Sequence, residues 1–161
     1  MALDGRGREQ AREVGKALAG RSLALVLVSD LARTRETARL ILRGRRVPTI
    51  VTSRLREMDY GRWEGLPARP LMRHLKATGK GWVAGSNFLA RRTPGGESFL
   101  QVRARIRPLP SLVRQRAIHG TVLVVAHYGS LRALLTVLLG LPEREAVRFT
   151  FGKCGMAVVT R

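Results

Sequence analysis

Two short apolar runs, each leading directly into a helical pattern, constrain the fold of this chain most strongly. Residues 23–29 and 122–126 are apolar almost without alternation, as expected for strands covered on both faces of a parallel sheet. Apolar residues then recur at helical spacing over residues 31–42 and 130–139. This alternation predicts an α/β layered fold with a mostly parallel central sheet flanked by helices.

Capping residues, glycines and prolines place the other elements within one domain, residues 1–161. The 161 residues are 45% apolar, enough to bury a core. In chain order we expect a helix from Asp4 to about Gly20, a strand over residues 47–52, a short helix over 71–77 in an irregular region, a helix from Ser98 that breaks near Pro108 and resumes to Ala117, and a last strand over 156–160.

The chain is a basic protein, with 30 Lys and Arg against 11 Asp and Glu and a net charge of +19. A field of this sign favours partners that carry phosphate, whether metabolites or nucleic acid. The arginines are scattered through every element, which argues against a basic disordered tail. The apolar runs are too short to cross a bilayer, so we expect a cytoplasmic protein. Cys154, the single cysteine, is expected to be a small core residue.

The end of the second apolar run is a candidate anion site. His127 follows the run, and Gly129 permits a sharp turn into the helix. Backbone N–H groups from Tyr128 to Leu131 would then be free at a helix N-terminus, where phosphate is a common ligand. The alternative interpretation is a core strand that ends in an incidental histidine.

Two further clusters could take part in phosphate chemistry. Arg33 lies in the first turn of the helix after the first run, where the helix dipole disfavours a cation unless an anion lies beside it. Arg33 is therefore a candidate phosphate ligand, with a solvated side chain as the alternative. Glu57, Asp59 and Glu64 follow the strand over 47–52, and any of them could protonate a leaving oxygen if burial raised its pKa. Their spacing alone prefers none of the three.

Five motifs stand in order along the chain: residues 7–11 (GREQA), 29–38 (SDLARTRETA), 55–65 (LREMDYGRWEG), 94–98 (PGGES) and 126–133 (AHYGSLRA). Taken together and in this order, they resemble the motifs of the histidine phosphatase superfamily, the phosphoglycerate mutase-like fold. The resemblance implies that Arg33 and His127 contact phosphate and that Glu57 is the proton donor, which separates it from the other two carboxylates.

The sequence departs from the family pattern at its start. The family begins with a strand ending in Arg-His-Gly, whose histidine becomes phosphohistidine, and no Arg-His-Gly occurs here. His74 and His119 lack the context of that motif, and His127 matches the family's second histidine. We therefore expect a domain that lacks its first strand, which the resemblance places centrally in the sheet, and a chain that is inactive or nearly so as written.

The resemblance implies a phosphomonoester hydrolase or a phosphomutase that acts through a phosphohistidine, with no cofactor and no metal. A hydrolase is favoured because the segment between Gly65 and Pro94 is short and leaves little to shield a phosphoenzyme from water. The expected partner is a phosphorylated small molecule or a phosphoprotein. Nucleic acid is less favoured, a membrane is not expected, and an oligomer is compatible with the pattern. The alternative is a non-catalytic anion-binding or RNA-binding domain.

Overall fold

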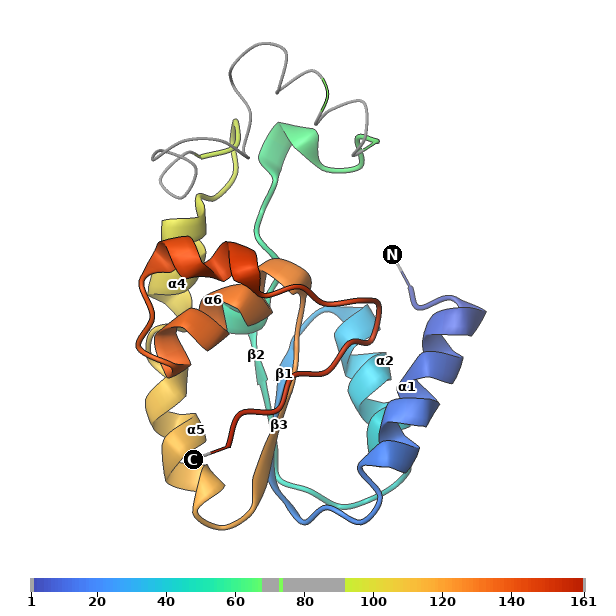
Figure 1. The fold of residues 1–161 in the computed structure, drawn as a ribbon. Helices are drawn as coiled ribbons and strands as arrows, with labels where there is room; N and C mark the ends of the chain where they lie inside the picture. The colour runs from blue at the N-terminus through green and yellow to red at the C-terminus, as the bar shows by residue number, and fades with distance from the viewer. Residues whose placement is uncertain (1, 68–72, 74–91, 161) are drawn as a thin grey trace.

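A computed structural model of the chain describes residues 2–67, 73 and 92–160. Helices cover both faces of a central sheet, giving three layers (Figure 1). The elements are α1 (Gly5–Ala17), β1 (Leu23–Ser29), α2 (Ala32–Leu42), β2 (Thr49–Thr52), α4 (Phe99–Ile106), α5 (Leu109–Ala117), β3 (Thr121–Val125) and α6 (Tyr128–Leu138), with 3₁₀ turns at Ser53–Leu55, Gly61–Trp63 and Glu143–Arg148.

The described sheet has three parallel strands in the order β2-β1-β3. Val28 pairs with Val51 on one side and with Val125 on the other. The middle strand, β1, is buried from Leu25 to Ser29, as a strand with helices on both faces must be. The predicted parallel α/β sheet is confirmed for these strands, and all three carboxyl ends meet at one edge.

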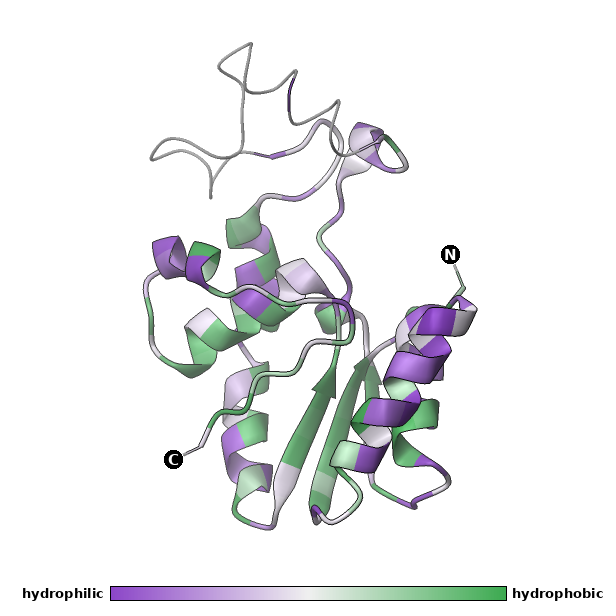
Figure 2. Cartoon of the chain, turned by 45° about the vertical axis from the view of Figure 1, so that its right-hand side comes forward, coloured by the Kyte–Doolittle hydropathy of each residue, from purple (hydrophilic) through white to green (hydrophobic). Residues whose placement is uncertain are grey.

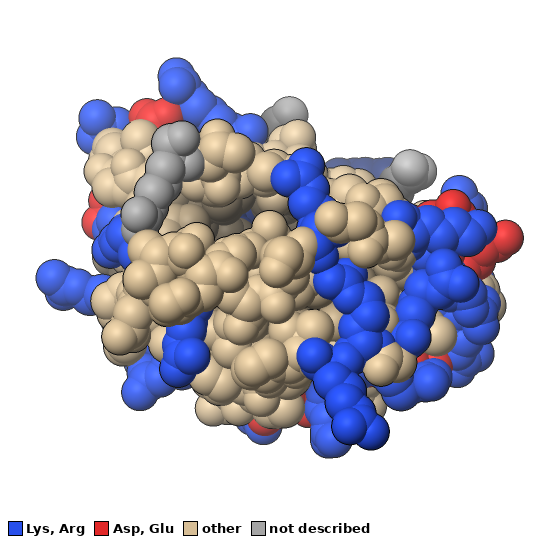
Figure 3. All heavy atoms as spheres, turned by 90° about the horizontal axis from the view of Figure 1, so that it is seen from below, with Lys and Arg blue, Asp and Glu red and all other residues tan. Residues whose placement is uncertain are grey.

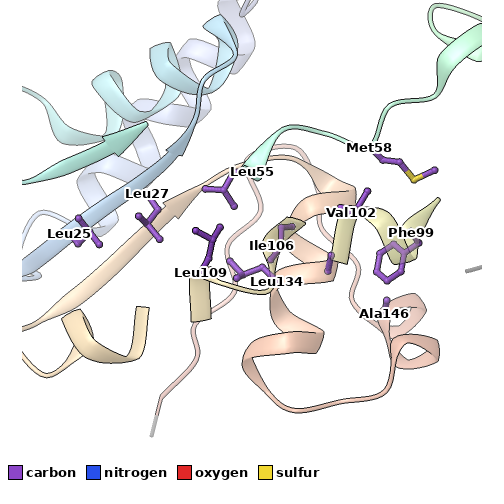
Figure 4. Packing of buried hydrophobic residues seen from close by; sticks show 11 residues of the cluster. Leu25, Leu27, Leu55, Met58, Phe99, Val102, Ile106, Leu109, Leu134 and Ala146 are labelled. Atoms are coloured by element: carbon purple, nitrogen blue, oxygen red, sulfur yellow. The ribbon is translucent and has the colours of Figure 1, made fainter. Parts of the chain in front are cut away.

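Alternate side chains of the sheet supply two cores, one on each face. Leu25 and Leu27 of β1 pack with residues of α4, α5 and α6 in the larger core, and Figure 4 shows Leu27 beside Leu55 and Leu109. Val28 and Val125 belong to the smaller core, with residues of α1 and α2. Figure 2 shows the result, with apolar strands in the middle and hydrophilic residues along the outer side of α1.

Local signals in the sequence fix several helix ends. Asp4 Oδ1 accepts a hydrogen bond from the Gly7 backbone N–H at 2.7 Å and so caps α1. Ser98 and Gln101 form a reciprocal capping box at the start of α4. These two starts agree with the sequence prediction. No helix among the described residues has both the length and the apolarity needed to cross a membrane.

Two predictions are wrong and one lies outside the described residues. Residues 156–160 form no strand, and Val158 is 76% exposed. The reason is that a strand needs a neighbour for its backbone groups, and among the described strands β3 pairs only with β1. Cys154 is half-buried and belongs to neither core cluster. The short helix predicted over 71–77 falls largely outside the residues that the structure describes.

Candidate active site

The candidate site lies at the carboxyl edge of the sheet. Ser29 ends β1, and His127 follows β3 by two residues, so the parallel pairing of these strands brings both to the same edge. Arg33 extends from the first turn of α2 toward the same place. Residues 94 positions apart in the sequence are thereby in contact. This edge is where open α/β sheets usually bind ligands.

The imidazole of His127 bridges the other two side chains. His127 is only 8% exposed, its Nδ1 lies 3.1 Å from Nη2 of Arg33, and its Nε2 lies 3.0 Å from Oγ of Ser29. Because a guanidinium can only donate, Nδ1 must be the acceptor. The proton of the neutral ring is therefore on Nε2, from which it donates to the Ser29 hydroxyl.

The electrostatic surroundings keep this ring neutral. Burial, and then the positive charges of Arg33 and Arg105, lower the pKa of His127 to about 4. At neutral pH the site therefore combines the guanidinium cation of Arg33 with a neutral imidazole. A phosphate bound beside Arg33 would offset the repulsion between the guanidinium and an imidazolium, and would thus favour protonation of His127.

Glu57 reaches the N-terminus of α6. Its Oε1 accepts hydrogen bonds from the backbone N–H groups of Met58 at 2.8 Å and Gly129 at 3.0 Å. A Cβ on residue 129 would lie 2.5 Å from that oxygen, so the approach requires glycine. The glycine thus permits a direct contact between the acid loop and the start of α6.

This contact corrects one expectation about the anion site. The N–H of Gly129 is not free, because it donates to Glu57, and the N–H of Leu131 donates to the carbonyl oxygen of His127 at 2.8 Å. A carboxylate of the chain itself therefore lies at the helix N-terminus, where the helix dipole favours negative charge. Of the predicted phosphate ligands, Arg33 and His127 are in contact with each other at this edge.

Comparison with known proteins identifies the family of this chain. The sequence model of the histidine phosphatase superfamily (branch 1) matches residues 1–161. This chain belongs to that superfamily. It is 33% identical over 147 residues to the adenosylcobalamin/alpha-ribazole phosphatase of Escherichia coli K12, covering 91% of this chain and 71% of the relative. It is 31% identical over 138 residues to phosphoserine phosphatase 1 of Hydrogenobacter thermophilus, covering 86% of this chain and 64% of the relative.

Solved structures of the superfamily share the fold. A putative alpha-ribazole-5'-P phosphatase from Escherichia coli K-12 superposes with a TM-score of 0.78 at 32% identity, over 94% of this chain and 73% of that chain. A mycobacterial glucosyl-3-phosphoglycerate phosphatase in complex with inorganic phosphate gives a TM-score of 0.78 at 29% identity, over 92% of this chain and 74% of that chain. The phosphoglycerate mutase-like fold predicted from the five motifs is therefore confirmed.

In this member of the superfamily, a network around Arg105 of α4 anchors the loop that carries Glu57. The Arg105 guanidinium donates to the carbonyl oxygens of Arg54, Arg56 and Glu57, the last two at 2.9 and 3.0 Å. It also pairs with Glu97 at 2.9 Å, and Glu97 in turn accepts the backbone N–H of Asp59 at 3.1 Å. Sequence reasoning missed Arg105, although Glu97 lies in one of the five motifs.

An ion pair ties the same loop to the end of β1. Arg56 contacts Asp30 at 2.6 Å through a forked arrangement in which two guanidinium nitrogens donate. The hydrogen bond from Arg56 holds the pKa of the Asp30 carboxyl below its ordinary value. Asp30 and Arg56 thus fix the acid loop next to the strand that carries Ser29.

The other two candidate carboxylates cap backbone groups of their own loop. Asp59 accepts the N–H of Gly61 at 2.7 Å, and Glu64 accepts the N–H of Tyr60 at 3.1 Å. Burial, followed by the negative charges of Glu57 and Glu64, raises the pKa of Tyr60 to about 12, so this phenol stays protonated. Of the three carboxylates, only Glu57 has a described hydrogen bond to the start of α6.

Tyr128 is placed differently from Arg33 and His127. Its side chain is 43% exposed, and its ring lies edge-on to Phe151 with Arg132 stacked 5.1 Å from its centroid. These contacts connect the start of α6 to the C-terminal segment. Within the described ranges, no three His, Cys, Asp or Glu side chains are grouped so as to hold a metal ion.

Proposed function

We propose that this chain supplies the phosphate-binding groups and the acid of a phosphomonoester hydrolase that acts through a phosphohistidine. The observation that carries the proposal is the convergence of Arg33, His127 and Glu57 at one edge of the sheet, from three segments far apart in the sequence. Convergence of a cation, an imidazole and a carboxylate suits transfer of a phosphoryl group.

Each of the three side chains has a distinct role in this proposal. The Arg33 guanidinium binds the equatorial oxygens of the phosphoryl group, where its fork of N–H donors matches phosphate. The ring of His127 takes up a proton on Nδ1 as charge builds on those oxygens, and it then donates a hydrogen bond to them. Glu57 gives its proton to the ester oxygen as the P–O bond breaks, and its carboxylate then takes a proton from the water that hydrolyses the phosphoenzyme.

The nucleophile in this scheme is the histidine of an Arg-His-Gly strand, a motif that the present sequence does not contain. The chain spans 71% and 64% of the two curated relatives described above. The activity of the whole protein, like its substrate, is thus part of the proposal. Because those relatives are phosphatases of alpha-ribazole and phosphoserine, we propose a phosphorylated small molecule as substrate and hydrolysis rather than mutase chemistry.

The direct test is to extend the chain at its N-terminus with the strand of a relative that ends in Arg-His-Gly. The extended protein should hydrolyse p-nitrophenyl phosphate and form an acid-labile phosphoenzyme. The matched control carries Arg-Ala-Gly and should do neither. An extended, folded protein with no turnover and no phosphoenzyme would remove the hydrolase proposal.

A second candidate is a domain that binds an anion without turning it over. The contact between Arg33 and His127 favours it, because that contact involves only residues present in this chain. Binding of inorganic phosphate to the 161-residue chain, with no hydrolysis of p-nitrophenyl phosphate by either the chain or its extended form, would select this function over the first.

A further inference from the structure

A second cationic site lies in a cleft of about 430 Å³ between α1 and α2. Four of its lining residues are cations, two from α1 and two from the end of α2, and no acidic residue lines it: Arg12, Lys16, Arg39, Leu40, Arg43 and Gly44. Arg33 lies in the first turn of α2 and Arg43 follows its last residue. About 15 Å of helix separates these two positions, so the cleft is distinct from the candidate active site.

Close packing of the two helices assembles this cluster. A Cβ on Gly15 would lie 2.7 Å from the carbonyl oxygen of Ile41, so glycine allows α1 to approach α2 closely. Arg12 and Lys16 are one turn apart on α1, about 6 Å along its axis, and Arg39 and Arg43 repeat that spacing. The two helices therefore bring two short rows of positive charge together.

Little negative charge compensates these rows within the protein. Lys16 pairs with Glu13 at 2.7 Å, and both side chains are 61% exposed. Glu36, one turn before Arg39, is paired with Arg8 at 2.6 Å. Among the described residues, Arg12, Arg39 and Arg43, the other three cations of the cleft, form no ion pair. The cluster is therefore electrostatically unfavourable in isolation and suited to an external polyanion.

The positive charge continues beyond the cleft. Arg45 donates to the carbonyl oxygens of Leu18 and Arg21 at 2.9 and 2.5 Å, which holds the loop after α2 against the loop after α1. Exposed Arg21 and Arg46 lie in these loops. Figure 3, seen from below, shows Lys and Arg side chains in a band across this end of the molecule. A band longer than the cleft suits a linear anion better than a small one.

We propose that the cleft between α1 and α2 binds the phosphate backbone of double-stranded nucleic acid without regard to sequence. Residues 5–46 contain no Phe, Tyr or Trp, so this surface has no side chain on which bases could stack. The large apolar side chains exposed in the described part of the chain lie outside α1 and α2, which disfavours insertion into a lipid surface. Binding through contacts to phosphate groups alone remains, and a duplex presents its phosphates outward.

Fluorescence anisotropy with a labelled 20-base-pair DNA of arbitrary sequence tests the proposal between 50 and 200 mM NaCl. Each phosphate contact contributes about 0.9 to the slope of log affinity against log salt. The double variant Arg12→Gln/Arg39→Gln should therefore lower the slope by about 1.8 and weaken binding roughly tenfold or more. The matched control, Arg107→Gln/Arg116→Gln, removes two exposed arginines elsewhere and should change affinity less than about threefold.

Three results would overturn the proposal: equal losses in the two double variants, no binding by the unaltered chain at 50 mM NaCl, or tighter binding to vesicles of anionic phospholipid than to DNA. Arg43→Asn provides a second variant if the first fails to fold, because Arg43 has a φ of 48° and asparagine tolerates that conformation. It should lower the slope by about 0.9. Arg33→Ala should leave DNA binding unchanged, which separates this site from the proposed hydrolase site.

Discussion

Replacing Arg105 by methionine should free the loop that carries Glu57 and destabilise the domain. Methionine retains an apolar stem for packing but removes every hydrogen bond of the guanidinium. Glu97 would lose its cationic partner, and the carbonyl oxygens of Arg54, Arg56 and Glu57 would lose a donor. The substitution therefore tests whether the acid loop is positioned from α4.

The structure sets the expected size of this effect. The side chains of Arg105 and Glu97 are 20% and 26% exposed, so their pair is mostly but not fully removed from water. Breaking a buried pair by deleting one partner costs about 3–5 kcal/mol, and the remaining exposure places this pair near the lower limit, about 3 kcal/mol. For a domain of this size that loss lowers the melting temperature by roughly 6–12 °C.

Urea and thermal unfolding followed by circular dichroism measure this change. Arg116→Met, an exposed arginine on the neighbouring helix α5, is the matched control and should change stability by less than about 0.5 kcal/mol. The Glu97→Gln variant and the corresponding double mutant isolate the coupling between the two side chains. An Arg105 variant as stable as the Arg116 control would refute the proposed anchoring.

Two further predictions concern the candidate active site. The pKa of His127 is about 4 in the folded chain against 6.5 for the free side chain, so His127 should contribute stability above pH 6.5 that is lost as the pH falls toward 4, because the unfolded chain binds the proton first. The free energy of unfolding, measured against pH, should show this loss. The same loss in His127→Gln would contradict the assignment to His127. In the chain extended with Arg-His-Gly, Glu57→Gln should slow hydrolysis of alkyl phosphates at least tenfold more than that of p-nitrophenyl phosphate, whose leaving group barely needs a proton. Asp59→Asn and Glu64→Gln should lack this selectivity, and its appearance in either would place the acid elsewhere.

The strands could be predicted from the sequence because their signals are local. The apolar run at residues 23–29 has the bounds of β1, and the run at 122–126 is within one residue of β3 at each end. The resemblance to the family, rather than spacing, selected Glu57 from three carboxylates, and the structure places its carboxylate against Gly129 of α6. The strands rest on short segments whose residue types determine their conformation.

Features that depend on distant partners could not be predicted in the same way. The hydrogen bond from Gly129 at the N-terminus of α6 to Glu57 joins residues 72 positions apart. No pattern within either segment predicts this contact. The role of Arg105 is likewise invisible in a chain with so many arginines. The strand expected over residues 156–160 failed for a related reason, since a strand is stable only beside a partner.

Titration calorimetry of inorganic phosphate into the 161-residue chain and into Arg33→Ala measures whether Arg33 binds phosphate. Arg35 is an exposed arginine on the same helix, and Arg35→Ala provides the matched control. We expect weak phosphate binding by the unaltered chain and by the Arg35 variant. The Arg33 variant should lose at least tenfold in affinity, since a hydrogen bond from a charged donor contributes about 1.5–3 kcal/mol. Equal affinity in all three proteins would contradict the assignment of Arg33 and His127 as the phosphate pocket.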